Sequence, residues 1–128
     1  MIVDTSALAA IVFEEPGADE LIAKLAQADR AGIGAPTLAE LSLVLTARLG
    51  SDPQGLILRL LDGFQIQEVA FGPRHWREAA DAFLKYGRGR HPARLNFGDC
   101  LSYAVARVEH QPLLFMGTDF TATDLEAA

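Results

Sequence analysis

The first thirteen residues, MIVDTSALAAIVF (Met1–Phe13), decide the class of fold. Ile2 and Val3 are β-branched residues of the kind found in buried strands, and the polar segment Asp4-Thr5-Ser6 that follows them is typical of a helix start. Ala7–Phe13 then continues as an apolar helix. We therefore expect a short buried strand that passes directly into a helix.

The same alternation of short apolar strands and longer helices continues through the chain. Gly and Pro punctuate the segments, and the apolar residues follow helical spacing between them. Further strands are expected at residues 31–35, 65–70 and 113–116, and further helices at residues 18–28, 36–49, 53–63, 73–86 and 97–108. One more helical turn is expected after Gly117.

This order predicts an α/β fold for the whole chain, taken as one domain of residues 1–128. A parallel sheet of four or five strands should be covered by helices on both faces. In the helix expected at residues 73–86, an apolar stripe is in helical register: Trp76, Ala79, Ala80 and Phe83.

Composition narrows the class of protein. Half of the 128 residues are hydrophobic, which supports a sizeable core without disulfides or a structural metal. Cys100 is the single cysteine, so no internal disulfide can form, and a reducing compartment such as the cytoplasm is expected. The chain starts without a basic segment and has no apolar run of about 20 residues, so neither a signal peptide nor a membrane span is expected.

Charge is unevenly distributed along the chain. The formal net charge of −6 argues against a nucleic-acid partner when it is taken alone. Residues 74–94, however, hold six Lys or Arg and two acids, a net of +4, which leaves the remainder at −10. A solvated helix face followed by a solvated loop would also explain this segment.

Four carboxylates follow the expected strands or begin helices: Asp4, Glu40, Asp99 and Asp119. In an open α/β sheet, ligands bind at the carboxyl ends of the strands. Each acid alone would also complement a helix dipole, but four together would repel one another. Mg²⁺ or Mn²⁺ would relieve that repulsion, whereas zinc is not expected, because the three histidines and the cysteine lack ligand spacing.

A carboxylate–metal cluster is suited to phosphodiester hydrolysis, since the metal lowers the pKa of bound water and screens the phosphate. An acidic site also needs basic side chains nearby, because these offset its repulsion of a polyanionic substrate. The expected loop before Asp99 supplies them as Arg88, Arg90 and Arg94, and Asn96 is placed to cap the helix that carries Asp99.

Four segments resemble the motifs of PIN-domain proteins, and in particular the VapC toxins among them. They are MIVDTSAL (residues 1–8), PTLAEL (36–41), LNFGDCL (95–101) and LLFMGTDF (113–120), the last followed by Thr123-Asp124. The order and spacing hold along the whole chain. The first and third segments are the more specific ones.

The resemblance implies a ribonuclease with Asp4, Glu40, Asp99 and Asp119 in its acidic site, Asp4 and Asp99 being the surest Mg²⁺ ligands. Ser6 would support the site by hydrogen bonding. The family's usual substrate is RNA, often tRNA or ribosomal RNA, its usual partner is a small VapB antitoxin, and homodimers are common. Thr118 departs from the Asn or Asp usual before the last acid, which leaves Asp124 as the alternative fourth carboxylate.

Two other functions are compatible with parts of the pattern. An aspartyl-nucleophile phosphatase also places Asp after an apolar first strand, but that motif requires a second Asp where this chain has Ser6. A PIN-like interaction module without catalysis would keep the fold and lose the acids, whereas all four acids are present here.

Overall fold

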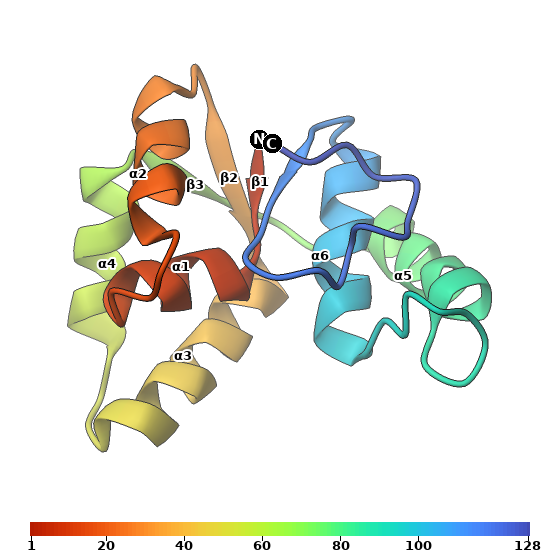
Figure 1. Ribbon diagram of the computed structural model, residues 1–128, viewed down its shortest axis with the longest axis horizontal. Helices are drawn as coiled ribbons and strands as arrows, with labels where there is room; N and C mark the ends of the chain where they lie inside the picture. The colour runs from red at the N-terminus through yellow and green to blue at the C-terminus, as the bar shows by residue number, and fades with distance from the viewer.

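The computed structural model describes residues 1–128 and confirms the alternation of strands and helices (Figure 1). Its elements are β1 (Ile2–Val3), α1 (Thr5–Val12), α2 (Ala18–Gln27), β2 (Ala31–Gly34), α3 (Ala35–Leu49), α4 (Gln54–Gly63), β3 (Ile66–Val69), α5 (Pro73–Tyr86), α6 (Phe97–Val108) and β4 (Leu113–Leu114). The four strands form one parallel sheet in the order β3-β2-β1-β4. No helix is long and apolar enough to cross a membrane.

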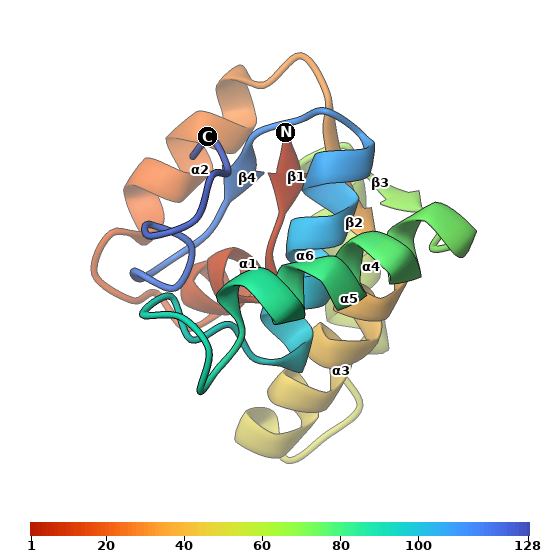
Figure 2. The ribbon, with the colours of Figure 1, turned by 90° about the vertical axis from the view of Figure 1, so that its right-hand side faces the viewer.

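Helices cover both faces of this sheet, as predicted. α1 to α4 lie on one side, and α5 and α6 lie on the other (Figures 1 and 2). Because successive side chains in a strand point to opposite faces, Ile2 and Leu113 enter the core beneath α5 and α6. Val3 and Leu114 enter the core beneath the first four helices. Although β1 and β4 have only two residues each, each strand contributes one side chain to the core on either face of the sheet.

The central strand, β1, fixes where the acidic residues can meet. It lies between β2 and β4, and all three run parallel, so their carboxyl ends reach the same edge of the sheet. The backbone N–H of Asp4 donates to the Leu114 carbonyl at 2.9 Å, which extends the pairing with β4 to that edge. α1 and α3 begin there immediately after their strands.

The helix start expected at Asp4-Thr5-Ser6 is confirmed, whereas two expectations for the end of the chain were wrong in detail. The first helix, α1, begins at Thr5, and Asp4 caps it. β4 ends at Leu114, and the tail forms turns rather than a helix, with Ala127 bridging to Leu113. The predicted apolar stripe of α5 lies largely outside the core: Trp76 is 56% exposed and Phe83 is 41% exposed. Periodicity predicts an apolar face but not what covers it.

Candidate active site

Asp4 is a buried carboxylate at the end of the central strand, with only 5% of its surface exposed. One oxygen, Oδ2, accepts hydrogen bonds from the Ser6 backbone N–H at 3.0 Å and from the Ser6 hydroxyl at 2.6 Å. The other, Oδ1, accepts from the Ser102 hydroxyl of α6 at 2.5 Å. These three donors compensate for the water that the charged group loses on burial. The supporting contact expected of Ser6 is present.

Glu40 lies in the second turn of α3, half-buried, and reaches across to the start of α6. Its Oε1 accepts a hydrogen bond from the Thr5 hydroxyl. Its carboxylate lies so close to Gly98 that a Cβ at position 98 would overlap it. Glycine at position 98 therefore lets the Glu40 carboxylate reach the helix that carries Asp99.

Asp99 and Asn96 form a reciprocal cap at the start of α6. The Asn96 side chain accepts from the Asp99 backbone N–H, and Asp99 Oδ2 accepts from the Asn96 backbone N–H, both at 2.9 Å. The cap predicted for Asn96 is confirmed, and it fixes the position of the Asp99 carboxylate. Capping alone would explain Asp99, so evidence for a further role has to be sought in the groups around its carboxylate.

The surroundings of Asp99 raise its pKa to about 6. Desolvation is the largest cause, and the hydrogen bond from the Asn96 backbone opposes it. The negative charges of Asp119, Asp4 and Glu40 each raise the pKa further. The structure thus brings all four predicted acids into one electrostatic cluster, with Asp119 contributed by the exposed segment after β4.

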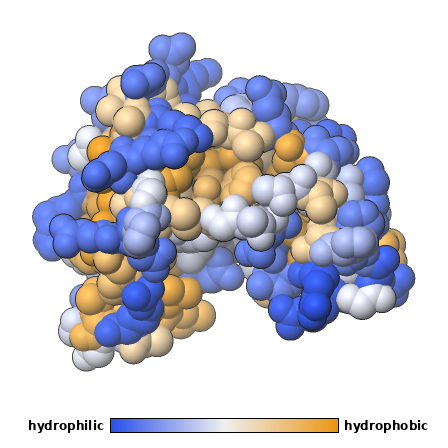
Figure 3. Space-filling view, in the orientation of Figure 1, coloured by the Kyte–Doolittle hydropathy of each residue, from blue (hydrophilic) through white to orange (hydrophobic).

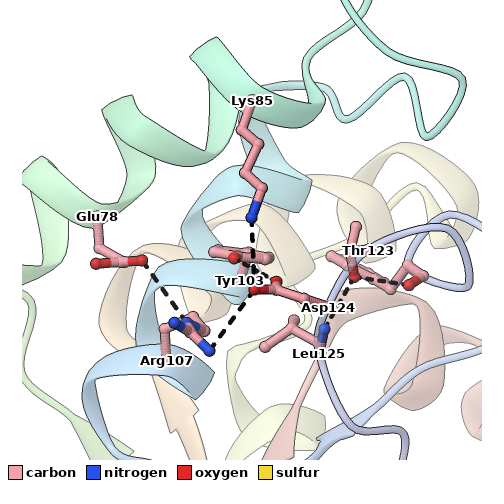
Figure 4. A network of polar contacts seen from close by, with 8 residues as sticks. Glu78, Lys85, Tyr103, Arg107, Thr123, Asp124 and Leu125 are labelled. Atoms are coloured by element: carbon pink, nitrogen blue, oxygen red, sulfur yellow. Dashed lines mark hydrogen bonds and ion pairs between the residues drawn. The ribbon is translucent and has the colours of Figure 1, made fainter.

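Asp124, the alternative fourth acid, is engaged elsewhere (Figure 4). It accepts a hydrogen bond from the Tyr103 hydroxyl at 2.7 Å and lies 3.6 Å from Lys85 Nζ and 3.8 Å from Arg107 Nη1. The hydrogen bond from Tyr103 is the main cause that lowers the pKa of Asp124. Asp124 is not among the groups that perturb Asp99, so the geometry favours Asp119 as the fourth acid.

The three loop arginines are exposed beside the amino end of α6. Backbone hydrogen bonds between Arg88 and Leu95 and between Leu95 and Tyr86 close the base of the loop. The Arg90 guanidinium lies 5.9 Å from the centre of the Phe83 ring. In Figure 3 the lower outline of the molecule is hollowed between the apolar surface of α3 and α4 and the hydrophilic surface at lower right, where Figure 1 places this loop.

Sequence reasoning missed three hydroxyl side chains of the site: Thr5, Thr37 and Ser102. Ser102 donates to Asp4 and lies 3.3 Å from the Thr37 hydroxyl, and Thr5 donates to Glu40. The sequence did contain an indication of Ser102. Apart from the hydroxyl of Tyr103, it is the only polar side chain in the stretch of α6 from Cys100 to Ala106.

The chemistry of these donors fits a hard divalent cation. Four carboxylates offer oxygen ligands, and burial, together with the neighbouring carboxylates, raises the pKa of Asp99. As the side chains stand, no three His, Cys, Asp or Glu residues are grouped closely enough to hold one ion. The carboxylates would therefore have to draw together around it.

Comparisons with known proteins identify the family of the chain. The PIN domain family model matches residues 1–125. Ribonuclease VapC36 of Mycobacterium tuberculosis is 48% identical over 98% of this chain and 91% of its own length. Ribonuclease VapC42 of the same species is 46% identical over 100% of this chain and 98% of its own length.

Solved structures share the fold at low sequence identity. The M. tuberculosis VapC20 structure, described as a sarcin–ricin loop cleaving toxin, superposes with a TM-score of 0.79 at 18% identity, covering 99% of this chain and 97% of that one. A VapBC2 structure from Rickettsia felis, bound to a DNA fragment from its promoter, gives a TM-score of 0.73 at 16% identity, covering 99% and 96%.

The raised pKa of Asp99 predicts a pH-dependent stability of the metal-free protein. The folded state binds this proton more tightly than the unfolded state, whose pKa is 3.8, so stability falls as pH rises from 3.8 through about 6. In chelator, Asp99→Asn should therefore be more stable than wild type at about pH 7.5, by about 1 kcal/mol after allowance for solvent screening. Asparagine keeps the oxygen that accepts from Asn96.

The measurement is urea unfolding of both proteins at several pH values. The advantage of Asp99→Asn should shrink as the pH is lowered towards about 4, where the wild-type carboxyl is increasingly protonated in both states. A variant that is less stable than wild type at about pH 7.5 would show that the folded protein does not raise the pKa of Asp99 as described.

Proposed function

The chain belongs to the PIN-domain family and to its VapC ribonucleases, and from that membership we propose that it is a Mg²⁺-dependent ribonuclease. Mn²⁺ is the expected substitute, and RNA phosphodiester bonds, in tRNA or ribosomal RNA, are the proposed substrate. The proposed role is that of the toxin in a type II toxin–antitoxin pair, acting in the cytoplasm.

The observation that carries this proposal is the convergence of four carboxylates at one edge of the sheet, where three of them raise the pKa of the fourth. Asp4, Glu40, Asp99 and Asp119 would hold the divalent ion, which when bound lowers the pKa of water and screens the phosphate charge. The protein's own contribution is orientation. Ser6 and Ser102 hold Asp4, and Asn96 holds Asp99.

A metal-dependent nuclease should lose its activity when Asp4 becomes asparagine. The amide would keep the shape of the side chain and would remove a charge that is costly to bury, so Asp4→Asn should stay folded. Cleavage of total RNA with Mn²⁺ should fall by about 100-fold or more, because a direct ligand matters at least as much as the groups that orient it. Chelator should abolish cleavage by the wild type.

Asp29→Asn is the matched control, since it removes the same charge from an exposed position outside the cluster. It should cleave as the wild type does. When expressed without antitoxin, the wild type and Asp29→Asn should arrest growth, and Asp4→Asn should not. A folded Asp4→Asn protein that cleaves RNA and arrests growth as wild type would favour the alternative, a PIN-like interaction module whose effect does not depend on the acids.

The exposed arginine loop supplies the proposed contacts to RNA phosphates. Replacing Arg88, Arg90 and Arg94 together by Ala should weaken RNA binding and reduce the dependence of log affinity on log salt. The slope should change by about 2, at about 0.7 for each phosphate contact to single-stranded RNA. Fluorescence anisotropy at several salt concentrations measures it, with a catalytically dead Asp4→Asn background to prevent cleavage.

The control for net charge is a second triple variant that removes arginines away from the site: Arg30, Arg48 and Arg59. It should leave the slope close to that of the parent protein. Equal slopes in all three proteins would exclude the loop as the RNA contact.

A VapB-type antitoxin and a second copy of this chain are the proposed protein partners. The structural neighbours include a toxin–antitoxin complex from Klebsiella pneumoniae and the VapBC2 assembly.

The surface proposed for the homodimer is an apolar hollow of about 420 Å³ between α5 and the start of α6. Figure 2 shows these two helices side by side. Phe97 at its rim is 79% exposed, and an apolar surface of this kind is typical of an interface.

Trp76→Glu should therefore convert a dimer into a monomer in sedimentation-velocity experiments, because it places a charge in the apolar contact. Leu58→Glu is the control: this leucine is 65% exposed on α4, on the other side of the sheet, and its replacement should leave the dimer intact. A wild-type protein that stays monomeric at high concentration would refute the homodimer.

A further inference from the structure

Three buried polar side chains, those of Asp4, Thr37 and Ser102, belong to one hydrogen-bonded network. Apart from the tyrosines, four buried residues carry a polar or charged side chain: Asp4, Thr5, Thr37 and Ser102. Ser102 is 1% exposed and Thr37 is 2% exposed. Because a buried polar group without a partner is costly, these three linked side chains indicate a shared role.

The hydrogen bonds between Thr37, Ser102 and Asp4 have a defined direction. A carboxylate can only accept, so the single hydroxyl hydrogen of Ser102 points to Asp4 Oδ1. Ser102 can then only accept from Thr37, whose hydroxyl lies 3.3 Å away. The direction therefore runs from Thr37 on α3 through Ser102 on α6 to Asp4. A serine inside a helix would otherwise be free to bond its own helix backbone.

A second directed chain reaches the other oxygen of Asp4. The Met116 backbone N–H donates to the Ser6 hydroxyl at 3.0 Å, and that hydroxyl donates to Asp4 Oδ2. Oδ2 also accepts from the Ser6 backbone N–H. Each carboxylate oxygen has about two lone-pair sites. Both sites of Oδ2 are thus occupied, whereas Oδ1 keeps one that no protein donor uses.

We propose that Ser102, oriented by Thr37, is a positioning residue of the active site. With Ser6 it fixes the Asp4 carboxylate so that a single lone pair of Oδ1 remains for a divalent cation. The inference rests on the proposed function, because it concerns how one acid of that site is presented. Its consequence is that Asp4 acts through one oxygen and depends on a hydroxyl that is 98 residues away in sequence.

The test compares Ser102→Ala, Thr37→Val and the double variant by Mn²⁺ titration and by RNA cleavage. Groups that orient a metal ligand typically change metal affinity by about 10–100-fold. Ser102→Ala should weaken Mn²⁺ binding by about tenfold and lower kcat without changing KM for RNA. Thr37→Val should have a smaller effect of about threefold. The double variant should be no worse than Ser102→Ala, because Thr37 acts only through Ser102.

Thr46→Val is the control, since the Thr46 hydroxyl bonds only to the Ser42 carbonyl on the exposed side of α3. Thermal melts in chelator establish that each variant is folded, and if Ser102→Ala is not, Thr37→Val tests the same chain. Wild-type Mn²⁺ affinity in both single variants would overturn this inference alone. A wild type that binds no Mn²⁺ would overturn the proposed function as well.

Discussion

A buried carboxylate at the end of the central strand is the constraint on which the rest of the site depends. Asp4 has too little contact with water to keep its charge unless the protein supplies hydrogen bonds. Its donors come from α1 and α6, and the groups that orient those donors come from α3 and the segment after β4. Four separate parts of the chain must therefore pack correctly before this charge is accommodated.

The same arrangement explains why the acids carry a cost in the metal-free protein. Burial of the Asp99 carboxyl and the like charges gathered around it oppose folding, and both raise its pKa. Proteins tolerate such local strain where function requires it, and the two apolar cores supply the compensating stability. Under the proposed function, the segregation of basic residues into residues 74–94 has a matching explanation, since a polyanionic substrate must approach an acidic edge.

Much of the fold could be predicted from local signals. The bounds of α5 were predicted correctly because Pro73 and Gly87 mark its ends, and those of α6 because Asn96 caps it. The convergence of Asp4, Glu40, Asp99 and Asp119 followed from their positions after strands or at helix starts, and the structure brings them together. Their catalytic and metal-binding roles stay predictions.

What could not be predicted depends on contacts between distant segments. The exposed apolar stripe of α5 has the same periodicity as a buried one, so the sequence does not reveal whether the chain itself covers Trp76 and Phe83. The hydrogen bond from Ser102 to Asp4 depends on the packing of α6 against β1, which no local pattern encodes. The sequence preferred Asp119 and left Asp124 as the alternative, and only the structure shows that Asp124 lies beside Tyr103 and Lys85.

The most direct measurement is a crystal structure of the wild-type protein with Mn²⁺, with anomalous diffraction collected to locate the ion. The account predicts an anomalous peak between the carboxylates of Asp4 and Asp99, with Asp4 bound through Oδ1 and with Ser102 still donating to that same oxygen. A Mn²⁺ ion located away from these carboxylates, with the cluster as it stands in the metal-free protein, would contradict it.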